Sequence, residues 1–126
     1  AAARARIDAA LDAAGLDPAT LPKAERTAVR DLERPEALRL SVALALMGRP
    51  RLLAVDDTDM KLSDDERADV WEMLRSVAAA GTTVLAVCSD APEDAVTVRT
   101  DASPETTDAT THEEEPADAF AETGRA

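Results

Sequence analysis

The stretch RLLAVDDTDMKLSDDER, residues 51–67, contains the features that decide the fold of this chain. It begins with a run of apolar residues that stops abruptly at two adjacent carboxylates, Asp56 and Asp57. A short run that is apolar at successive positions is typical of a strand buried on both faces, as in a parallel sheet. We therefore expect a buried strand over residues 51–55, with the two acids directly at its end.

A helix and a second strand are predicted after this run. Ser63 is the expected N-cap of the helix, because Glu66 completes a capping box with it. Gly81 ends the helix, whose expected buried face consists of Val70, Trp71, Leu74, Val77 and Ala78. A second buried strand is predicted over residues 83–88, and a weaker one over residues 96–99. Strand, helix and strand in this order form a βαβ unit, whose strands run parallel.

Two more helices are predicted before the first strand. One covers residues 4–14, where apolar side chains recur at helical spacing, and Gly15 is suited to cap its C-terminus. The other starts near Pro35, a residue suited to the first helical turn, and ends at Met47. Prolines break any helix in the connector between them, residues 16–30. The expected fold class is α/β, with short parallel strands and flanking helices.

Charge is distributed unevenly along the 126 residues, whose net charge is −12. Residues 101–126 hold eight Asp and Glu side chains against one Arg and have almost nothing to bury, which predicts a disordered acidic tail. We therefore divide the chain into a helical part (1–48), an α/β part (49–100) and this tail. A chain this acidic is a poor binder of nucleic acid, because phosphate contacts need clustered Lys and Arg.

Two features bear on the compartment. Cys88 is the single cysteine, so no disulfide can form within the chain, which suits a reducing environment. The longest apolar run, residues 40–47, is far too short to span a bilayer, and no charged-then-apolar leader opens the chain. We expect no transmembrane segment.

The acidic pair is the first candidate for chemistry. In open parallel sheets, ligands bind beyond the carboxyl ends of the strands, which is where Asp56 and Asp57 are expected. Two acids there can hold Mg²⁺ and can orient a water for attack on a phosphate. The alternative is that the two residues only begin a polar turn.

The wider context resembles a known family. LRLSVALALMGRPRLLAVDD, residues 38–57, resembles the signature helix and Walker B strand of the ATP-binding-cassette (ABC) ATPases. LSDDERADVWEMLRSVAAAGTTVLAVCSD, residues 62–90, resembles the segment from the D-loop to the switch strand of that family. The resemblance covers about residues 4–100, and it rests on the order and spacing of these segments. It implies a partial P-loop NTPase-like fold of the ABC ATPase type.

The resemblance implies roles for the acidic pair. Asp56 falls where the family has its magnesium-associated Walker B aspartate, and Asp57 falls where it has the glutamate that polarises the attacking water. Because Asp is one methylene shorter than Glu, its carboxylate would lie roughly an ångström or more back, and catalytic geometry is sensitive at that scale.

The signature loop, usually L-S-G-G-Q, corresponds here to Leu32, Glu33, Arg34, Pro35 and Glu36. In the family this loop offers a hydroxyl and backbone N–H groups to the terminal phosphate of ATP. Glu33 replaces the hydroxyl with an anion, and Pro35 removes a backbone N–H. Unless Glu33 turns away or Arg34 contacts the phosphate, we expect no clamping of ATP in the usual way. The default for Arg34 is an exposed loop side chain.

Other positions depart from the family pattern as well. Ser89 occupies the place of the switch histidine, and a serine cannot take up a proton near neutral pH. Residues 58–61 read Thr-Asp-Met-Lys where the family usually has Pro-Thr-Ser-Gly. The phosphate-binding loop, G-x-x-x-x-G-K-[ST], does not occur in these residues. We expect that loop to lie before residue 1, so that the sequence resembles the C-terminal half of a cassette domain, inactive alone.

By this resemblance the chain is an ABC transporter-type ATP-binding subunit with impaired turnover. Its implied cofactors are ATP and Mg²⁺, and its implied partners are a membrane permease and a second nucleotide-binding domain. Its implied location is the cytoplasmic face of the cell membrane. The alternative is an ATPase-inactive regulatory or scaffold subunit derived from an ABC domain. A phosphoacceptor receiver domain is disfavoured, because it would need an acceptor Asp on a later strand and a Lys beyond it, and no Lys follows Lys61.

Overall fold

The computed structural model describes residues 1–100, and the predicted tail at 101–126 lies outside the described residues. The chain divides into two units, Ala1–Glu93 and Asp94–Ala126, and the elements described below belong to the first of them. The sequence-based boundary between residues 48 and 49 stays a prediction. Within the described part, no helix combines the length and the apolar character that crossing a membrane requires.

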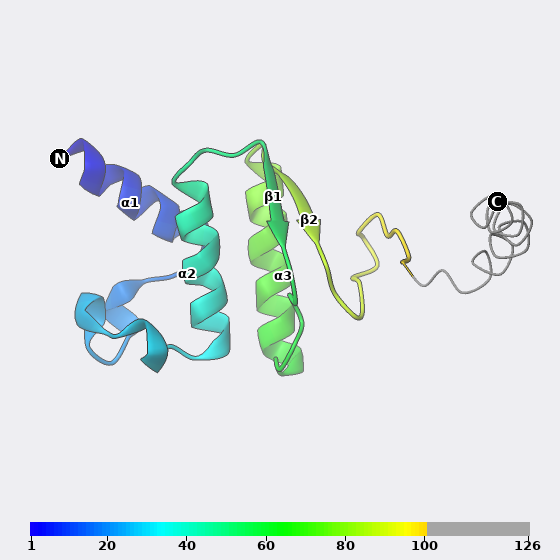
Figure 1. Cartoon of the computed structure of the whole chain (residues 1–126), viewed down its shortest axis with the longest axis horizontal. Helices are drawn as coiled ribbons and strands as arrows, with labels where there is room; N and C mark the ends of the chain where they lie inside the picture. The colour runs from blue at the N-terminus through cyan, green and yellow to red at the C-terminus, as the bar shows by residue number, and fades with distance from the viewer. Residues whose placement is uncertain (101–126) are drawn as a thin grey trace, which may run out of the picture. The chain divides into compact units, whose positions relative to one another are not determined.

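The first unit is an α/β structure (Figure 1). Three short 3₁₀ turns between residues 18 and 31 form the connector, where the prolines exclude an α-helix. The helices and strands are α1 (Ala2–Ala13), α2 (Arg34–Leu46), β1 (Leu52–Val55), α3 (Asp64–Ala79) and β2 (Thr83–Ala86). The predicted order of three helices and two strands is confirmed. The P-loop NTPase-like assignment rests on the resemblance rather than on this small sheet.

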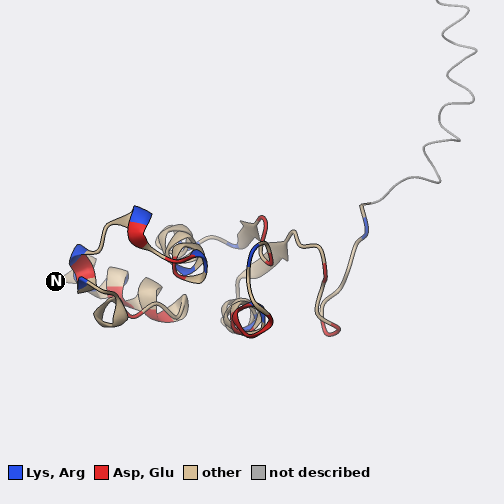
Figure 2. Cartoon of the chain, turned by 90° about the horizontal axis from the view of Figure 1, so that it is seen from below, with Lys and Arg blue, Asp and Glu red and all other residues tan. Residues whose placement is uncertain are grey.

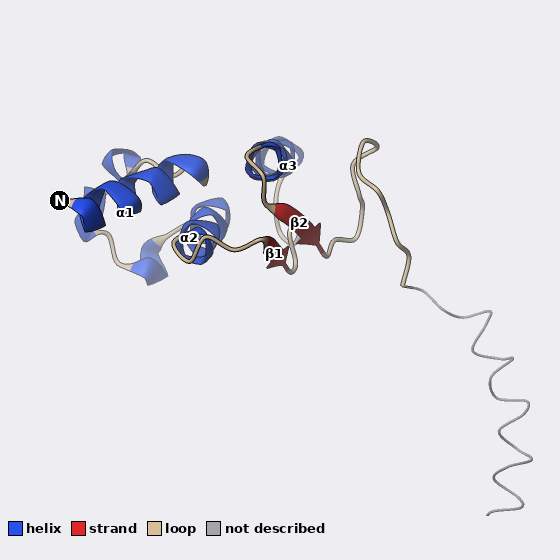
Figure 3. Cartoon of the chain, turned by 90° about the horizontal axis from the view of Figure 1, so that it is seen from above, coloured by secondary structure: helices blue, strands red, loops and turns tan. Residues whose placement is uncertain are grey.

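The two strands pair in parallel, with Leu52 opposite Thr83 and Val55 opposite Ala86. This pairing confirms the predicted βαβ unit, in which α3 is the crossover helix. In Figure 3, α3 lies along one side of the two strands. Because the strands run in the same direction, the residues that follow β1 and β2 meet at one edge of the sheet.

The prediction that the first strand is buried on both faces is wrong, and so is the prediction that the second strand is buried. Leu53 is 4% exposed, whereas its neighbour Leu52 is 55% exposed, and Leu85 of β2 is 57% exposed. Side chains of a strand alternate between the two faces, and α3 covers only one of them. Successive apolar residues therefore divide into an inner row against the helix and an outer row on the surface.

The core lies between the three helices and the inner face of the sheet. The predicted buried face of α3 is confirmed at Val70, Leu74 and Val77. It is wrong at Ala78, which is exposed, and Met73 is buried instead. Helices α2 and α1 complete the cluster with Leu38, Val42, Ala43, Ala10 and Ala14.

The second strand is shorter than predicted, and the weak third strand is wrong. β2 ends at Ala86 rather than at Cys88. Residues 96–99 form no strand, and Val96 is 97% exposed. Valine has a high β-propensity, but Val96 and Val98 are both exposed and have no buried face that a strand would need.

The ends of the helices follow local chemistry. Ser63 and Glu66 form the predicted capping box: the Glu66 N–H donates to Ser63 Oγ at 3.2 Å, and the Ser63 N–H donates to Glu66 Oε1 at 2.9 Å. Gly15, just after α1, has φ +71°, a left-handed conformation that glycine adopts without cost. The capping box thus fixes the start of α3, and Gly15 follows the end of α1, as the sequence predicted.

Ser63→Ala should lower the free energy of unfolding by about 1 kcal/mol, because it leaves the Glu66 N–H without its side-chain acceptor. Urea denaturation followed by far-UV circular dichroism measures this loss. Ser76→Ala, at an exposed position within the same helix, is the matched control and should change stability by less than half as much. Equal effects of the two substitutions would contradict the capping role.

Candidate functional site

Asp56 and Asp57 lie directly after β1, at the carboxyl edge of the parallel pair. Both side chains are exposed. No ion pair found among residues 1–100 involves either acid. Elsewhere in this part of the chain, basic and acidic residues are interspersed along helices and loops (Figure 2). The pair therefore faces solvent at the edge of the sheet where ligands bind in open parallel sheets.

The two acids have different local geometry. Asp56 Oδ1 accepts a hydrogen bond of 2.8 Å from the backbone N–H of Asp57, which orients the Asp56 carboxylate. Asp57 has φ +52°, a left-handed conformation that Asp tolerates better than most residues. Asp56 remains exposed as a residue.

A magnesium ion fits this donor set only with help from other ligands. Among residues 1–100 there is no group of three or more His, Cys, Asp or Glu side chains placed to hold a metal. Mg²⁺ in nucleotide sites is commonly held by one or two carboxylates together with phosphate oxygens and waters. The chemistry of the Asp56 and Asp57 side chains fits that mode, and it does not fit a site made entirely of protein ligands.

The loop after β1, residues 56–60, is here called the acidic loop. Thr58 in this loop is fully buried, and both its N–H and its Oγ1 donate to the Val87 carbonyl, at 3.2 and 3.0 Å. The Val87 N–H in turn donates to the Val55 carbonyl at 2.8 Å. These bonds extend the pairing of the two strands beyond their ends.

Asp59 makes the next connection between the two strand ends. Its carboxylate accepts the backbone N–H of Ser89 at 3.0 and 3.2 Å and that of Asp90 at 3.1 Å. The structure thus brings Ser89 to the acidic loop, while its backbone N–H is already bonded. Sequence reasoning assigned no role to Asp59, because its partners lie about thirty residues away.

The amino end of α2 carries the residues that align with the signature loop. Glu33 is the N-cap, and it forms a capping box with Glu36, whose Oε1 accepts the Glu33 N–H at 2.9 Å. Leu32 precedes the cap and ends the last 3₁₀ turn, and Pro35 lies in the first turn of the helix. The helix end therefore already faces an anionic side chain. A phosphate does not fit here without displacing Glu33, because both are negative.

Arg34 joins this helix end to the acidic loop. Its Nη2 donates to the Asp57 carbonyl at 3.0 Å, and its Nε lies 3.4 Å from the Met60 carbonyl. The two sets of predicted site residues, at α2 and after β1, are thus in contact through one side chain. Its assigned role as a phosphate contact stays a prediction, and so do the roles of the other site residues.

No protein-family model matches the chain. Three curated relatives carry the name Nod factor export ATP-binding protein I. They come from Cupriavidus pinatubonensis (39% identical over 70 residues), Cupriavidus metallidurans (42% over 57 residues) and Rhizobium johnstonii (39% over 70 residues). The resemblance to ABC nucleotide-binding domains is confirmed. The matches cover 56%, 45% and 56% of this chain but only 22%, 19% and 22% of the relatives.

Lys61 has an unusual, left-handed backbone conformation. Lys61 aligns with the glycine of the family's Pro-Thr-Ser-Gly pattern, and its φ is +60°. Glycine adopts this left-handed conformation readily, whereas a side chain makes it unfavourable by about 1–2 kcal/mol. Lys61 therefore places a side chain in a backbone conformation that favours glycine.

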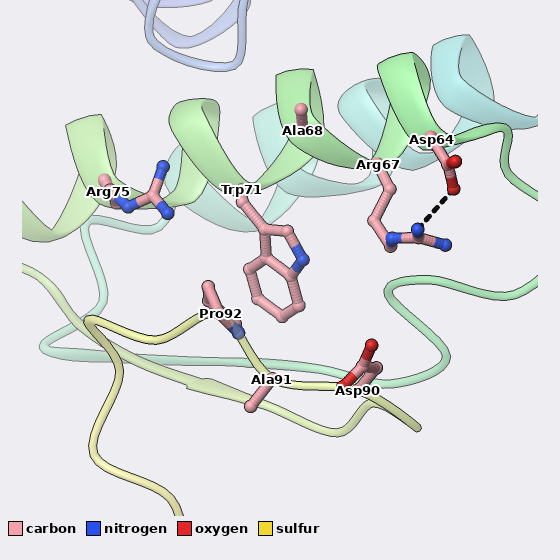
Figure 4. Close-up of a pocket in the computed structure, with 8 residues that line it drawn as sticks. All are labelled: Asp64, Arg67, Ala68, Trp71, Arg75, Asp90, Ala91 and Pro92. Carbon is pink, nitrogen blue, oxygen red and sulfur yellow. Dashed lines mark hydrogen bonds and ion pairs between the residues drawn. The ribbon is translucent and has the colours of Figure 1, made fainter.

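A separate cavity of about 330 Å³ lies between α3 and the segment after β2 (Figure 4). Trp71 projects from α3 toward Pro92 and Ala91, and Arg67 forms an ion pair with Asp64 at 2.5 Å. None of the residues assigned to the ABC site lines this cavity. Trp71 also packs against the core, so its aromatic ring both fills space and forms one wall.

Lys61→Gly should raise the free energy of unfolding by about 0.5–1 kcal/mol, because relief of the left-handed strain exceeds the extra chain entropy of glycine. Urea denaturation measures the change. Lys23→Gly is the matched control, since Lys23 is the other lysine and has φ −121°. It should give no stabilisation. A loss of stability in both variants would contradict strain at Lys61.

The thiol of Cys88 should react with iodoacetamide at a higher pH in the folded chain than in the unfolded chain. Burial raises its pKa, and the negative charge of Asp59 raises it further. Because the thiolate is the reactive form, the midpoint of the rate–pH profile should lie higher in the folded chain than in urea. Asp59→Asn should move the midpoint down. Coincident midpoints for the folded and unfolded chains would contradict the shift.

Proposed function

We propose that these residues form part of an ABC transporter-type ATP-binding subunit in which Asp56 takes part in holding the Mg²⁺ of bound ATP. The observation that carries the proposal is the exposed carboxylate pair at the carboxyl end of β1. Similarity to proteins named for ATP binding supports it. When bound, the metal would neutralise phosphate charge, and Asp57 would orient a water toward the terminal phosphate.

The proposal requires a phosphate cradle from elsewhere. The 126 residues contain no G-x-x-x-x-G-K-[ST] loop, and their matches cover 19–22% of the relatives. The backbone amides and lysine that hold the β- and γ-phosphates in this family would therefore belong to another segment or another subunit. In this arrangement the described residues supply the carboxylates that hold Mg²⁺ and orient the water, and the phosphates are held by another segment or subunit.

Turnover in this arrangement is weak or absent. The carboxylate of Asp57 is one methylene shorter than the family's glutamate, and positioning errors of an ångström are costly in catalysis. Ser89 offers no titrating group near neutral pH, and its N–H is bonded to Asp59. Glu33 occupies the helix end that would otherwise attract the terminal phosphate.

The partners of the proposed subunit are a membrane permease and a second nucleotide-binding domain, at the cytoplasmic face of the membrane. The names of the relatives, which refer to export and to ATP binding, support this arrangement. ATP binding between two paired domains would then drive movement of the permease.

A second candidate is a subunit that pairs with a competent domain without hydrolysing ATP. Two observations favour it. The capping box places Glu33 against the amino end of α2, and the guanidinium of Arg34 is bonded to backbone carbonyls of the acidic loop. Both features leave the signature position poorly suited to a phosphate.

Asp56→Ala should weaken the binding of Mg²⁺·ATP to the full-length protein by about tenfold or more, because it removes a charge-assisted ligand. Isothermal titration calorimetry measures the affinity, and phosphate release measures turnover. Asp69→Ala, which removes the same charge from an exposed position of α3, should leave both unchanged. Tight binding with turnover that Asp56→Ala abolishes would eliminate the scaffold alternative. Binding that is indifferent to Asp56 would refute the metal role.

A further inference from the structure

Asp59 stands out because its carboxylate faces inward, to the backbone of a neighbouring loop, whereas Asp56 and Asp57 are exposed. It is half-buried and accepts two N–H groups, from Ser89 and Asp90. Residues 89–92 are here called the switch segment, after the family position of Ser89. The segment has no regular secondary structure, so these bonds take the place of strand pairing beyond the end of β2.

A carboxylate suits this task better than any other side chain of its length. Oδ2 accepts both N–H groups, from Ser89 at 3.0 Å and from Asp90 at 3.1 Å, and Oδ1 lies 3.2 Å from the Ser89 nitrogen. Hydrogen bonds to a charged acceptor are about twice as strong as neutral ones. An amide in its place would keep one oxygen for the two donors but would lose the charge, and its NH₂ group would replace the second acceptor of the Ser89 N–H. The geometry therefore depends on the chemistry of Asp and not only on its size.

The bonds also connect two sites that are separate on the surface. Thr58 and Asp59 follow the acidic pair directly in the chain and hold the backbone from Val87 to Asp90. Asp90 then forms one wall of the cavity that contains Trp71, together with Ala91 and Pro92 (Figure 4). A short series of hydrogen bonds thus joins the acidic loop to the wall of the Trp71 cavity.

We propose that Asp59 is a positioning residue that fixes the switch segment to the acidic loop, so that the acidic pair, Ser89 and the wall of the Trp71 cavity move together. In the nucleotide-bound protein, this connection would report occupancy of the acidic pair at the switch segment and the cavity. That second statement rests on the function proposed above, whereas the positioning role itself does not.

Amide hydrogen exchange in the absence of nucleotide tests the positioning role. In Asp59→Ala the exchange of the Ser89 and Asp90 amides should accelerate about tenfold relative to the wild type, because both lose a charged acceptor. Asp59→Asn should give both amides intermediate protection, because its single amide oxygen can accept both N–H groups but carries no charge. Asp69→Asn is the matched control and should change neither. Far-UV circular dichroism verifies that each variant is folded, and unchanged exchange in folded Asp59→Ala would overturn the role.

Fluorescence provides the readout at the cavity, because Trp71 is the single tryptophan of the chain. In Asp59→Ala, displacement of the cavity wall formed by residues 90–92 should shift the emission of Trp71 to longer wavelength and increase its quenching by acrylamide. Asp69→Asn should change neither. Emission identical to the wild type would show that Asp59 does not hold the cavity wall.

Mg²⁺·ADP tests the coupling to nucleotide in the full-length protein. It should change Trp71 quenching in the wild type and not in Asp59→Ala, although both bind the nucleotide. If both bind and respond alike, the coupling is overturned and the proposed function stands. If neither binds, the proposed function fails together with the coupling, and the positioning role is decided by amide exchange alone.

Discussion

The parallel pairing of β1 with β2 is the constraint on which the rest of this structure depends. Because both strands end at the same edge, residues thirty positions apart in the chain become neighbours there. The pairing requires a crossover, which α3 provides, and α3 contributes Val70, Met73, Leu74 and Val77 to the core that packs against the strands. The acidic pair, Thr58 and Asp59 have a defined position only because this pairing continues into the loops.

Three elements meet at the acidic loop. The acidic loop directly follows β1. The side chain of Arg34 in α2 donates a hydrogen bond to the loop, and the switch segment is bonded to the loop through Asp59. Each of these contacts joins a side chain, Arg34 or Asp59, to backbone atoms, so it depends on the type of one residue and not of the other. The chain resembles ABC domains in order and spacing and departs from them at residues 33–36, 58–61 and 89.

The sequence predicted the elements well because their determinants are local. The capping box of Ser63 and Glu66, the glycine after α1 and the helical spacing of Val70, Leu74 and Val77 each act within a few residues. Burial of the strands could not be predicted in the same way, since it depends on how many layers cover the sheet. The acidic pair was located correctly relative to β1. The roles of Arg34 and Asp59 depend on partners 23–31 residues away, which no local pattern reveals.

The outer row of the sheet has a physical consequence of its own. Leu52 and Leu85 present apolar surface to water, and in the described structure each strand has a partner along only one of its two edges. Unpaired N–H and C=O groups beside apolar side chains are the usual template for intermolecular β-sheet growth. Concentrated solutions of these residues alone would therefore tend toward self-association, and added salt, which screens the repulsion arising from the net charge of −12, would promote it.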